Sequence, residues 1–246
     1  MPTNKKILAV IPARWASTRF PGKPIADILG KPMVQWVSEH AQNASLVSEV
    51  VVATDDQRIY DVVTNFRGKA VMTSPNHESG TDRVAEVAKN TECDIVVNVQ
   101  GDEPLFNPKD ISNLIKKKNI YKKEVLLGYT EIKNWSDFNS QNIPKILFDE
   151  KKNLIYASRS QIPFLQNKKR KFKGYRQVLA YCFPRNKILK FGKNRKKTPL
   201  EKIEDIEILR FLELGINVKM LKMSNKSVPV DVHSDLKKVE KILKKK

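Results

Sequence analysis

Short apolar runs alternate with stretches whose apolar side chains recur every three or four residues over the first half of the chain. The runs are almost continuous in Val, Ile, Leu and Ala, as in strands that are buried on both faces of a sheet. They predict strands over residues 5–13, 48–56, 69–75 and 93–104. The stretches between them predict helices over residues 32–44, 57–68, 79–91 and 107–120. This alternation predicts an α/β fold, with a mainly parallel central sheet flanked by helices.

The pattern changes from about residue 124. Apolar segments there follow one another without helical spacing between them and predict a hairpin-rich section over residues 124–132, 144–160 and 175–183. A basic loop at 165–174 interrupts this section. Beyond it, the spacing predicts a helix, a strand and a helix over residues 200–214, 216–223 and 234–246. We therefore expect one domain over residues 1–246, with a smaller hairpin-rich lobe inserted at about 124–200.

The chain is strongly basic, with 46 Lys and Arg against 27 Asp and Glu and a net charge of +19. Much of the excess is lysine, in short runs in predicted loops and in the last helix. Proteins that bind nucleic acids usually gather such charge on one face, with arginines and stacking aromatic residues. The pattern here favours a solvated surface that also attracts small anionic substrates. Binding to nucleic acid is a distant alternative, which would show a steep dependence on salt.

The sequence shows no membrane span and no disulfide framework. Its apolar runs, such as residues 7–11 and 50–53, are far shorter than the roughly 18 residues that a membrane helix requires. The N-terminal segment reaches Pro12 and Arg14 after a short apolar run, which indicates a strand rather than a signal peptide. Cys93 and Cys182 are far apart and form no C-x-x-C motif. We expect a soluble protein of the reducing cytoplasm.

The loop after the first strand is a candidate phosphate site. In an open parallel sheet, ligands bind beyond the carboxyl ends of the strands. Residues 12–24 lie at such a position and hold Arg14, Arg19 and Lys23 among prolines and Gly22. Small residues let backbone N–H groups approach phosphates, and cations balance their charge. The spacing matches neither the Walker A motif nor the dinucleotide fingerprint. An ordinary surface loop with exposed cations is the alternative.

The loop after the most apolar strand is a candidate metal site. Gln100-Gly101-Asp102-Glu103-Pro104 follows that strand, and a carboxylate at such a strand end can hold Mg²⁺, which prefers oxygen ligands. The same residues also suit a simple turn. The three histidines have no metal-binding spacing.

Two carboxylate-rich segments contain expected helix caps. Asp56 is the expected N-cap of the helix that starts near Gln57. Ser79, with Asp82 three residues later, resembles a capping box. Capping leaves Ser79 and Arg83 able to face a ligand as well.

Seven segments together resemble one known family. They run in order along nearly the whole chain: IPARWASTRFPGKP (11–24), GKPM (30–33), VATDD (52–56), MTSPNHESGTDR (72–83), VNVQGDEP (97–104), ASRSQIPF (157–164) and VDVHSDL (230–236). The chain resembles the 3-deoxy-manno-octulosonate cytidylyltransferases, or CMP-KDO synthetases, and the first loop, SGTDR and QGDEP are highly specific in combination. The resemblance implies a Rossmann-like nucleotidyltransferase fold and a homodimer formed through the smaller lobe. It also implies Mg²⁺-dependent transfer of CMP from CTP to the 2-hydroxyl of 3-deoxy-D-manno-octulosonate (KDO), with release of pyrophosphate, for lipopolysaccharide synthesis.

The resemblance also implies roles for individual residues. The expected catalytic residues are Arg14, Lys23, Asp102 and Asp231, of which Asp102 and Asp231 would hold Mg²⁺. The expected nucleotide-binding residues are Ala13, Arg14, Arg19, Lys23, Ser79, Arg83 and Gln100. The expected sugar-binding residues are Arg159, Gln177, Tyr181 and Glu207. Such a set neutralises charge on the phosphates and holds the nucleophile in line.

The chain departs from the family pattern in the expected sugar pocket. Gln177 stands where the family usually has histidine, and Ile208 stands where a glutamine is common. Loss of hydrogen-bonding side chains can change which substrate a site accepts. The 8-amino analogue of KDO, or another 2-keto sugar acid, is therefore an alternative acceptor. A homologue that binds CTP without turnover is a further alternative, against which Lys23, Asp102 and Asp231 argue.

Overall fold

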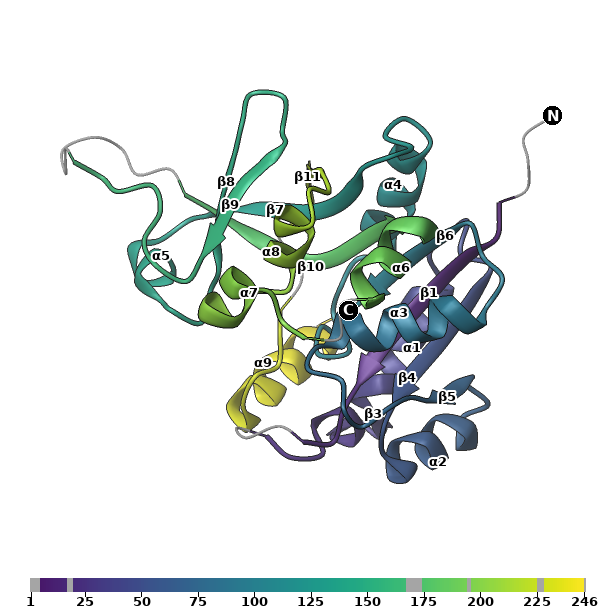
Figure 1. The fold of residues 1–246 in the computed structure, drawn as a ribbon. Helices are drawn as coiled ribbons and strands as arrows, with labels where there is room; N and C mark the ends of the chain where they lie inside the picture. The colour runs from purple at the N-terminus through teal and green to yellow at the C-terminus, as the bar shows by residue number, and fades with distance from the viewer. Residues whose placement is uncertain (1–4, 17–19, 167–173, 194–195, 225–227, 246) are drawn as a thin grey trace.

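The computed structural model describes residues 5–16, 20–166, 174–193, 196–224 and 228–245 (Figure 1). Its centre is a mixed sheet with the strand order β11-β7-β10-β6-β1-β4-β5. The strands are β1 (Ile7–Ala13), β4 (Glu49–Thr54), β5 (Ala70–Met72), β6 (Ile95–Val99), β7 (Val125–Ile132), β10 (Gly174–Pro184) and β11 (Val218–Lys222). Arg19 and most of the predicted basic loop at 165–174 lie outside the described residues.

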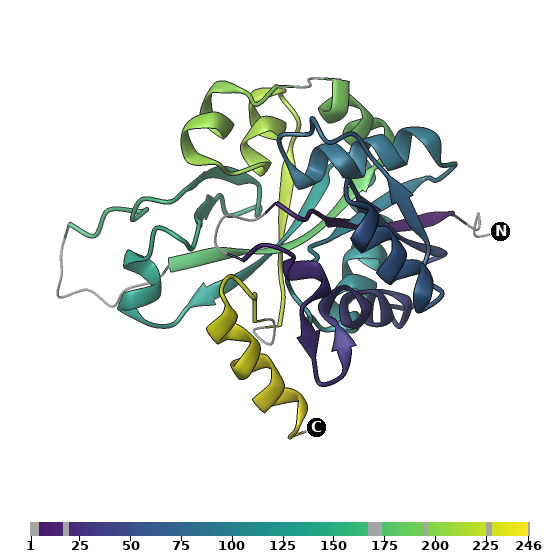
Figure 2. The same ribbon diagram turned by 90° about the horizontal axis from the view of Figure 1, so that it is seen from below.

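The sheet is mainly parallel, as predicted. β1 pairs in parallel with β4 and β6, β4 pairs in parallel with β5, and β11 pairs in parallel with β7. β10 runs antiparallel between β6 and β7. Helices α1 (Met33–Gln42), α2 (Gln57–Asn65), α3 (Gly80–Asn90) and α4 (Pro108–Lys118) form where the sequence predicts them. They connect the first strands and cover both faces of the sheet (Figure 2).

Strand β1 shows why its sequence is continuously apolar. Leu8 and Val10 point to the core on one face of the sheet, while Ile7, Ala9 and Ile11 point to the core on the other. α3 and α6 (Arg185–Lys193) cover the first face, and α1, α2 and α4 cover the second. Both faces therefore need apolar side chains.

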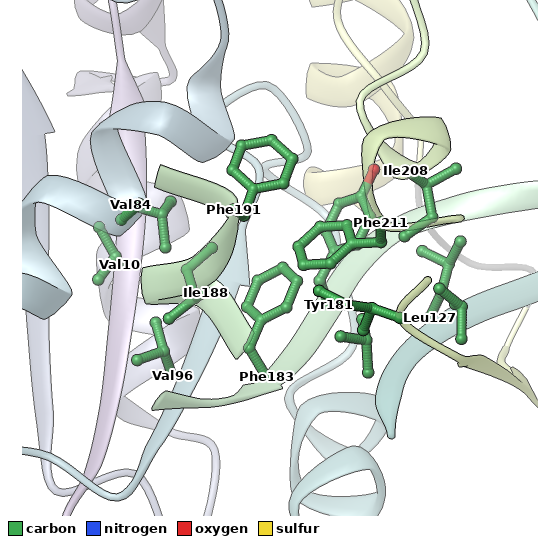
Figure 3. Packing of buried hydrophobic residues seen from close by; sticks show 14 of the residues in the cluster. Val10, Val84, Val96, Leu127, Tyr181, Phe183, Ile188, Phe191, Ile208 and Phe211 are labelled. Atoms are coloured by element: carbon green, nitrogen blue, oxygen red, sulfur yellow. The ribbon is translucent and has the colours of Figure 1, made fainter. Parts of the chain in front are cut away.

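The core of the first face is rich in aromatic rings (Figure 3). The ring of Phe211 stacks on those of Phe191 and Phe183, with centroid distances of 4.7 Å and 5.3 Å. Phe183 in turn stacks on Tyr181 of the same strand, at 5.7 Å. This packing holds α6 and α8 (Ile208–Glu213) against β10.

The prediction of one helix over 200–214 is wrong. The structure has two short helices there, α7 (Pro199–Glu204) and α8, separated at Asp205, whose φ is 52°. The guanidinium group of Arg159 donates to the carbonyl oxygens of Glu204 (2.7 Å) and Asp205 (3.0 Å). A continuous helix would need those carbonyls for its own hydrogen bonds. The bonds from Arg159 therefore satisfy the carbonyl groups at the break. Helix α6, which the apolar pattern did not predict, is a further difference.

The predicted hairpin-rich section divides between two places. β8 (Lys145–Phe148) and β9 (Leu154–Ser158) form an antiparallel hairpin beside α5 (Trp135–Asn139), and in both ribbon views it lies across the molecule from β4 and β5. β7 and β10 instead extend the central sheet. The division into one domain with a lobe at 124–200 stays a prediction.

The C-terminal segment packs against the start of the chain. α9 (His233–Leu243) and Val230 share a small core with Phe20, Met33 and Ile28. Ile28 lies in the short strand β2 (Asp27–Ile28), which follows the 3-10 helix η1 (Lys23–Ile25) and pairs with β3 (Lys31–Pro32). The packing of this C-terminal segment against the start of the chain brings Asp231 to the loop after β1.

None of the helices within the described ranges is both long and apolar enough to cross a membrane.

Candidate active site

A polar cleft of about 350 Å³ opens at the carboxyl ends of β1 and β6. Most of the predicted site residues line it: Ala13, Arg14, Lys23, Ser79, Arg83, Gln100, Asp102, Glu207 and Asp231. They come from the loops after β1 and β6, from the start of α3, from the start of α8 and from the segment before α9. The sheet topology therefore gathers side chains that are far apart in the sequence.

Gly101 allows two of these loops to meet. A Cβ atom at position 101 would lie 2.8 Å from the carbonyl oxygen of Pro12, which is closer than such contacts allow. With glycine there, the loop after β6 packs directly on the end of β1. Gln100 and Asp102 are thereby held beside Ala13 at the cleft.

Lys23 connects the loop after β1 to the carboxylate of Asp102 and to the residue before Asp231. Gly22, with φ 70°, precedes the 3-10 helix that starts at Lys23. The Lys23 amine donates to Oδ2 of Asp102 (2.9 Å) and to the carbonyl oxygen of Val230 (2.8 Å). The N–H of Val230 donates to the carbonyl oxygen of Asp102 (2.9 Å). These bonds bring Asp231, the next residue, to the same cleft as Asp102.

The second carboxylate oxygen of Asp102 suits a hard cation. Oδ1 is buried and accepts no hydrogen bond from the residues that the structure describes. Asp231 adds a second carboxylate to the cleft. Within the described ranges no cluster of three His, Cys, Asp or Glu side chains could enclose a metal ion. A pair of carboxylates fits Mg²⁺, which usually keeps waters and binds substrate phosphates.

Glu207 caps the first turn of α3. Its carboxylate accepts hydrogen bonds from the N–H groups of Gly80 (3.0 Å) and Thr81 (3.2 Å), and from the Thr81 hydroxyl. Burial raises the pKa of Glu207 above its ordinary value, and the hydrogen bonds from Thr81 and Gly80 oppose that rise. The predicted sugar-binding glutamate thus also shapes the wall of the cleft.

A buried ion cluster also holds the first turn of α3 in place. The guanidinium group of Arg210 in α8 is fully buried and bonds to Asp82 (2.6 Å) and Glu201 (2.5 Å). Ser79 is the N-cap of α3, as predicted, and its hydroxyl donates to Oδ2 of Asp82 (2.6 Å). α8 therefore sets the position of Ser79 in the cleft through Arg210 and Asp82.

Arg83 braces the ends of two strands. Its guanidinium group donates to Asp55 after β4, to the Thr73 hydroxyl (2.8 Å) and to the carbonyl oxygen of Ser74 (3.0 Å). Asp56, the neighbour of Asp55, caps α2 as predicted. The nucleotide-binding role of Arg83 stays a prediction, because its polar atoms also serve the fold.

The other predicted sugar residues lie away from the lining of the cleft. Arg159 donates to the Glu204, Asp205 and Gln141 carbonyls. Gln177, on β10, is buried, and its Oε1 accepts no hydrogen bond from the described part of the chain. Their roles stay predictions.

Tyr181 and Ile208 are core residues (Figure 3). Burial, reinforced by the carboxylates of Glu207, Glu103 and Asp102, raises the pKa of the Tyr181 phenol well above its ordinary value. The sugar-binding role of Tyr181 stays a prediction. The expectation that Ile208 lines the sugar pocket is wrong, because its side chain packs in the core of the first sheet face and is fully buried.

Three charged residues that the sequence analysis missed also line the cleft: Glu78, Lys197 and Asp205. Lys197 lies in a lysine run whose pattern favours a solvated surface, and Asp205 lies in the unpredicted break between α7 and α8. The apolar pattern carries no signal for either residue, because it does not show the break between α7 and α8.

Comparisons with known proteins agree with one another. A family model described as cytidylyltransferase matches residues 8–226. A 3-deoxy-manno-octulosonate cytidylyltransferase of Geotalea uraniireducens is 46% identical over 98% of this chain and 100% of its own length. The protein of that name from Chlamydia pneumoniae is 38% identical over 96% of this chain and 93% of its own.

Solved structures extend the comparison to the fold. The structure of CMP:2-keto-3-deoxy-manno-octonic acid synthetase complexed with CTP has a TM-score of 0.90 and 36% identity, and the match covers 98% of this chain and 99% of that one. A putative glucose-1-phosphate thymidylyltransferase of Bacillus anthracis, at 14% identity and a TM-score of 0.70, shares the fold over 96% of this chain and 94% of its own. The chain belongs to the 3-deoxy-manno-octulosonate cytidylyltransferase family.

Proposed function

We propose that this protein transfers CMP from CTP to the 2-hydroxyl of KDO and releases pyrophosphate. The observation that carries the proposal is the meeting of Lys23, Asp102 and Asp231 in one cleft at the carboxyl ends of β1 and β6. The relatives described above are named for this activity, and they match this chain over nearly its full length. The CMP-KDO would serve lipopolysaccharide synthesis.

The residues of the cleft divide the chemistry between them. Arg14 and Lys23 would neutralise negative charge on the triphosphate, which makes pyrophosphate a better leaving group. Ser79 and Gln100, with the backbone around Ala13, would hold the nucleotide beside them. Glu207 keeps the first turn of α3 in place through the Gly80 and Thr81 N–H groups. Fixed positions of this kind supply orientation, which is a large part of catalysis in phosphoryl transfer.

We propose that Asp102 and Asp231 hold the Mg²⁺ on which the reaction depends. Two observations support this assignment: Oδ1 of Asp102 accepts no hydrogen bond within the described ranges, and a second carboxylate lines the same cleft. When bound, the ion would offset phosphate charge and lower the pKa of the sugar hydroxyl. Lys23, already paired with Oδ2 of Asp102, would keep that carboxylate oriented toward the ion.

The acceptor is the part of the proposal that has a rival. KDO is favoured by the names of the relatives. The 8-amino analogue of KDO, or another 2-keto sugar acid, is favoured by Gln177, whose buried Oε1 accepts no hydrogen bond within the described residues. An acceptor with an additional N–H donor could satisfy that oxygen.

We also propose a cytoplasmic homodimer. Exposed apolar side chains on the hairpin side of the molecule, Trp135, Ile155, Phe164 and Ile203, support burial against a second copy. Both cysteines are free and buried, which suits a reducing compartment. Sedimentation of the wild-type protein and of an Ile155→Ser/Phe164→Ser variant tests the dimer, because a variant that sediments like the wild type would contradict this surface.

The function is tested by measuring pyrophosphate release with each of four nucleoside triphosphates and a panel of sugar acids. We expect release with CTP and KDO together, and none when either is omitted. A higher kcat/KM with the 8-amino analogue than with KDO would identify the analogue as the acceptor. Absence of release with every sugar acid would overturn the proposal.

A further inference from the structure

Lys197 and Asp205 form an ion pair at the cleft. Both residues line it, and the Lys197 amine lies 2.5 Å from Oδ1 of Asp205. The Asp205 side chain is 69% exposed, whereas that of Lys197 is 21% exposed. Ion pairs with so much contact with solvent contribute little to stability, so an anion that enters the cleft can replace Asp205 at little cost.

The backbone of Lys197 is fixed, although the amine of its side chain can change partner. Its N–H donates to Oε2 of Glu78 (3.0 Å), just before the N-cap of α3. The next residue, Thr198, forms a capping box with Glu201 at the start of α7, and its hydroxyl donates to Glu213. The backbone from which the side chain extends is therefore held at the cleft, and its amine donates to the exposed carboxylate of Asp205.

Two other cations of the cleft are bound more firmly. Lys23 is held by Asp102 and the Val230 carbonyl, and Arg83 is held by Asp55 and the residues after β5. Around Asp205, the hydrogen bond from Lys197 and the positive charges of Lys197, Arg159 and Arg14 lower the pKa of the carboxyl. The surroundings of Asp205 thus favour an anion.

We propose that Lys197 is a substrate-binding residue that exchanges Asp205 for an anionic group of a substrate. The group is an oxyanion, either a phosphate of CTP or the carboxylate of the acceptor. Without substrate, Asp205 fills the anion position and competes with the ligand. This inference rests on the proposed function of the cleft and adds to it a residue whose side chain changes partner.

The test compares Lys197→Gln, Asp205→Asn, the double variant and Lys202→Gln, a matched control on α7 whose lysine is exposed and lies outside the cleft. KM is measured for CTP and for the acceptor, each with the other substrate saturating. We expect Lys197→Gln to raise one of the two KM values about tenfold, as loss of a charge-assisted hydrogen bond does, with kcat changed less than about twofold.

Asp205→Asn should lower the same KM about two- to fivefold, since a weak competitor is removed. Asparagine accepts the left-handed backbone at this position, so the turn should persist. The double variant should match Lys197→Gln, because Asp205 acts through Lys197. The substrate whose KM responds identifies the group as phosphate or carboxylate.

The inference is overturned if Lys197→Gln leaves both KM values as Lys202→Gln does, or if Asp205→Asn raises KM as much as Lys197→Gln. The second result would mean that the ion pair acts as a structural unit. Calorimetric titration of CTP, and of the sugar acid in the presence of a non-hydrolysable CTP analogue, repeats the comparison without turnover. If the wild-type protein binds both substrates but forms no CMP-KDO, the proposed function is refuted. The binding titrations of the variants then still test the role of Lys197.

Discussion

The amine of Lys23 lies 2.9 Å from Oδ2 of Asp102 and joins the loop after β1 to the loop after β6. The same amine donates to the carbonyl of Val230, the residue before Asp231. Oδ1 of Asp102 is buried and accepts no hydrogen bond from the described chain. Lys23 therefore orients the carboxylate through one oxygen and leaves the other able to meet a further cation.

Removal of either carboxylate should disable the reaction without unfolding the protein. We expect Asp102→Asn and Asp231→Asn each to lower kcat by about a hundredfold or more, because phosphate charge in the transition state loses its counter-ion. The measurement is pyrophosphate release at saturating Mg²⁺, together with calorimetric titration of Mg²⁺ in the presence of CTP. Asp61→Asn, on the exposed face of α2, is the control. Turnover near that of wild type in either variant would remove that residue from the metal site.

The buried ion cluster should make a large contribution to stability. Arg210→Met leaves the buried carboxylates of Asp82 and Glu201 without their partner, which typically costs about 3–5 kcal/mol of unfolding free energy. Adding Asp82→Asn and Glu201→Gln to that variant should recover part of the loss, since no buried charge is then uncompensated. Urea unfolding measures both, and a loss below about 1 kcal/mol for Arg210→Met would contradict the cluster's role.

Lys118 should make stability rise with pH. Its side chain is buried at the end of α4, its amine donates to the Tyr121 carbonyl, and burial lowers its pKa to about 8. Between that value and the ordinary pKa of 10.5, the unfolded chain binds more protons than the folded one. The free energy of unfolding therefore increases with pH across this window and shows no such contribution below it.

The comparison variant is Lys118→Met, which lacks the titrating group. Relative to it, the wild type should gain about 1–3 kcal/mol of unfolding free energy from pH 8 to pH 10, at about 1.4 kcal/mol per pKa unit. Urea unfolding at several pH values measures the difference. A constant difference between the two proteins would mean that Lys118 titrates normally in the folded state.

Restoring the usual family residue at positions 177 and 208 should have different effects. Gln177→His should raise kcat/KM for KDO relative to its 8-amino analogue by about fivefold or more, because the imidazole replaces a buried amide oxygen that accepts no hydrogen bond in the described part of the chain. Ile208→Gln should instead lower stability by about 1–3 kcal/mol, because it places an amide in the apolar core. An unchanged ratio of kcat/KM values for Gln177→His would show that position 177 does not select the acceptor.

The parallel sheet and much of the cleft could be predicted from the sequence. β1 is a continuous apolar run because its side chains enter cores on both faces of the sheet. Lys23 and Asp102 follow two such strands, and parallel strands end at the same edge. Their meeting therefore follows from topology, while the ion pair between them needs coordinates.

Other features depend on contacts between distant segments. The apolar spacing from 200 to 214 suits one helix, and the break at Asp205 depends on hydrogen bonds from Arg159 at the end of β9. Lys197 resembles its lysine neighbours in the sequence, and only the fold brings it to the cleft. Ile208 follows Glu207 directly, yet one side chain enters the core and the other reaches α3.

We expect this protein to join the α-phosphate of CTP to a sugar hydroxyl. The most direct measurement follows CTP labelled with ³²P at the α position, incubated with KDO and Mg²⁺, and identifies the labelled product by chromatography and mass. The label should move into CMP-KDO, in equal amount to the pyrophosphate released. Label that stays in CTP, or that appears as free CMP from the start in the presence of KDO, would contradict it.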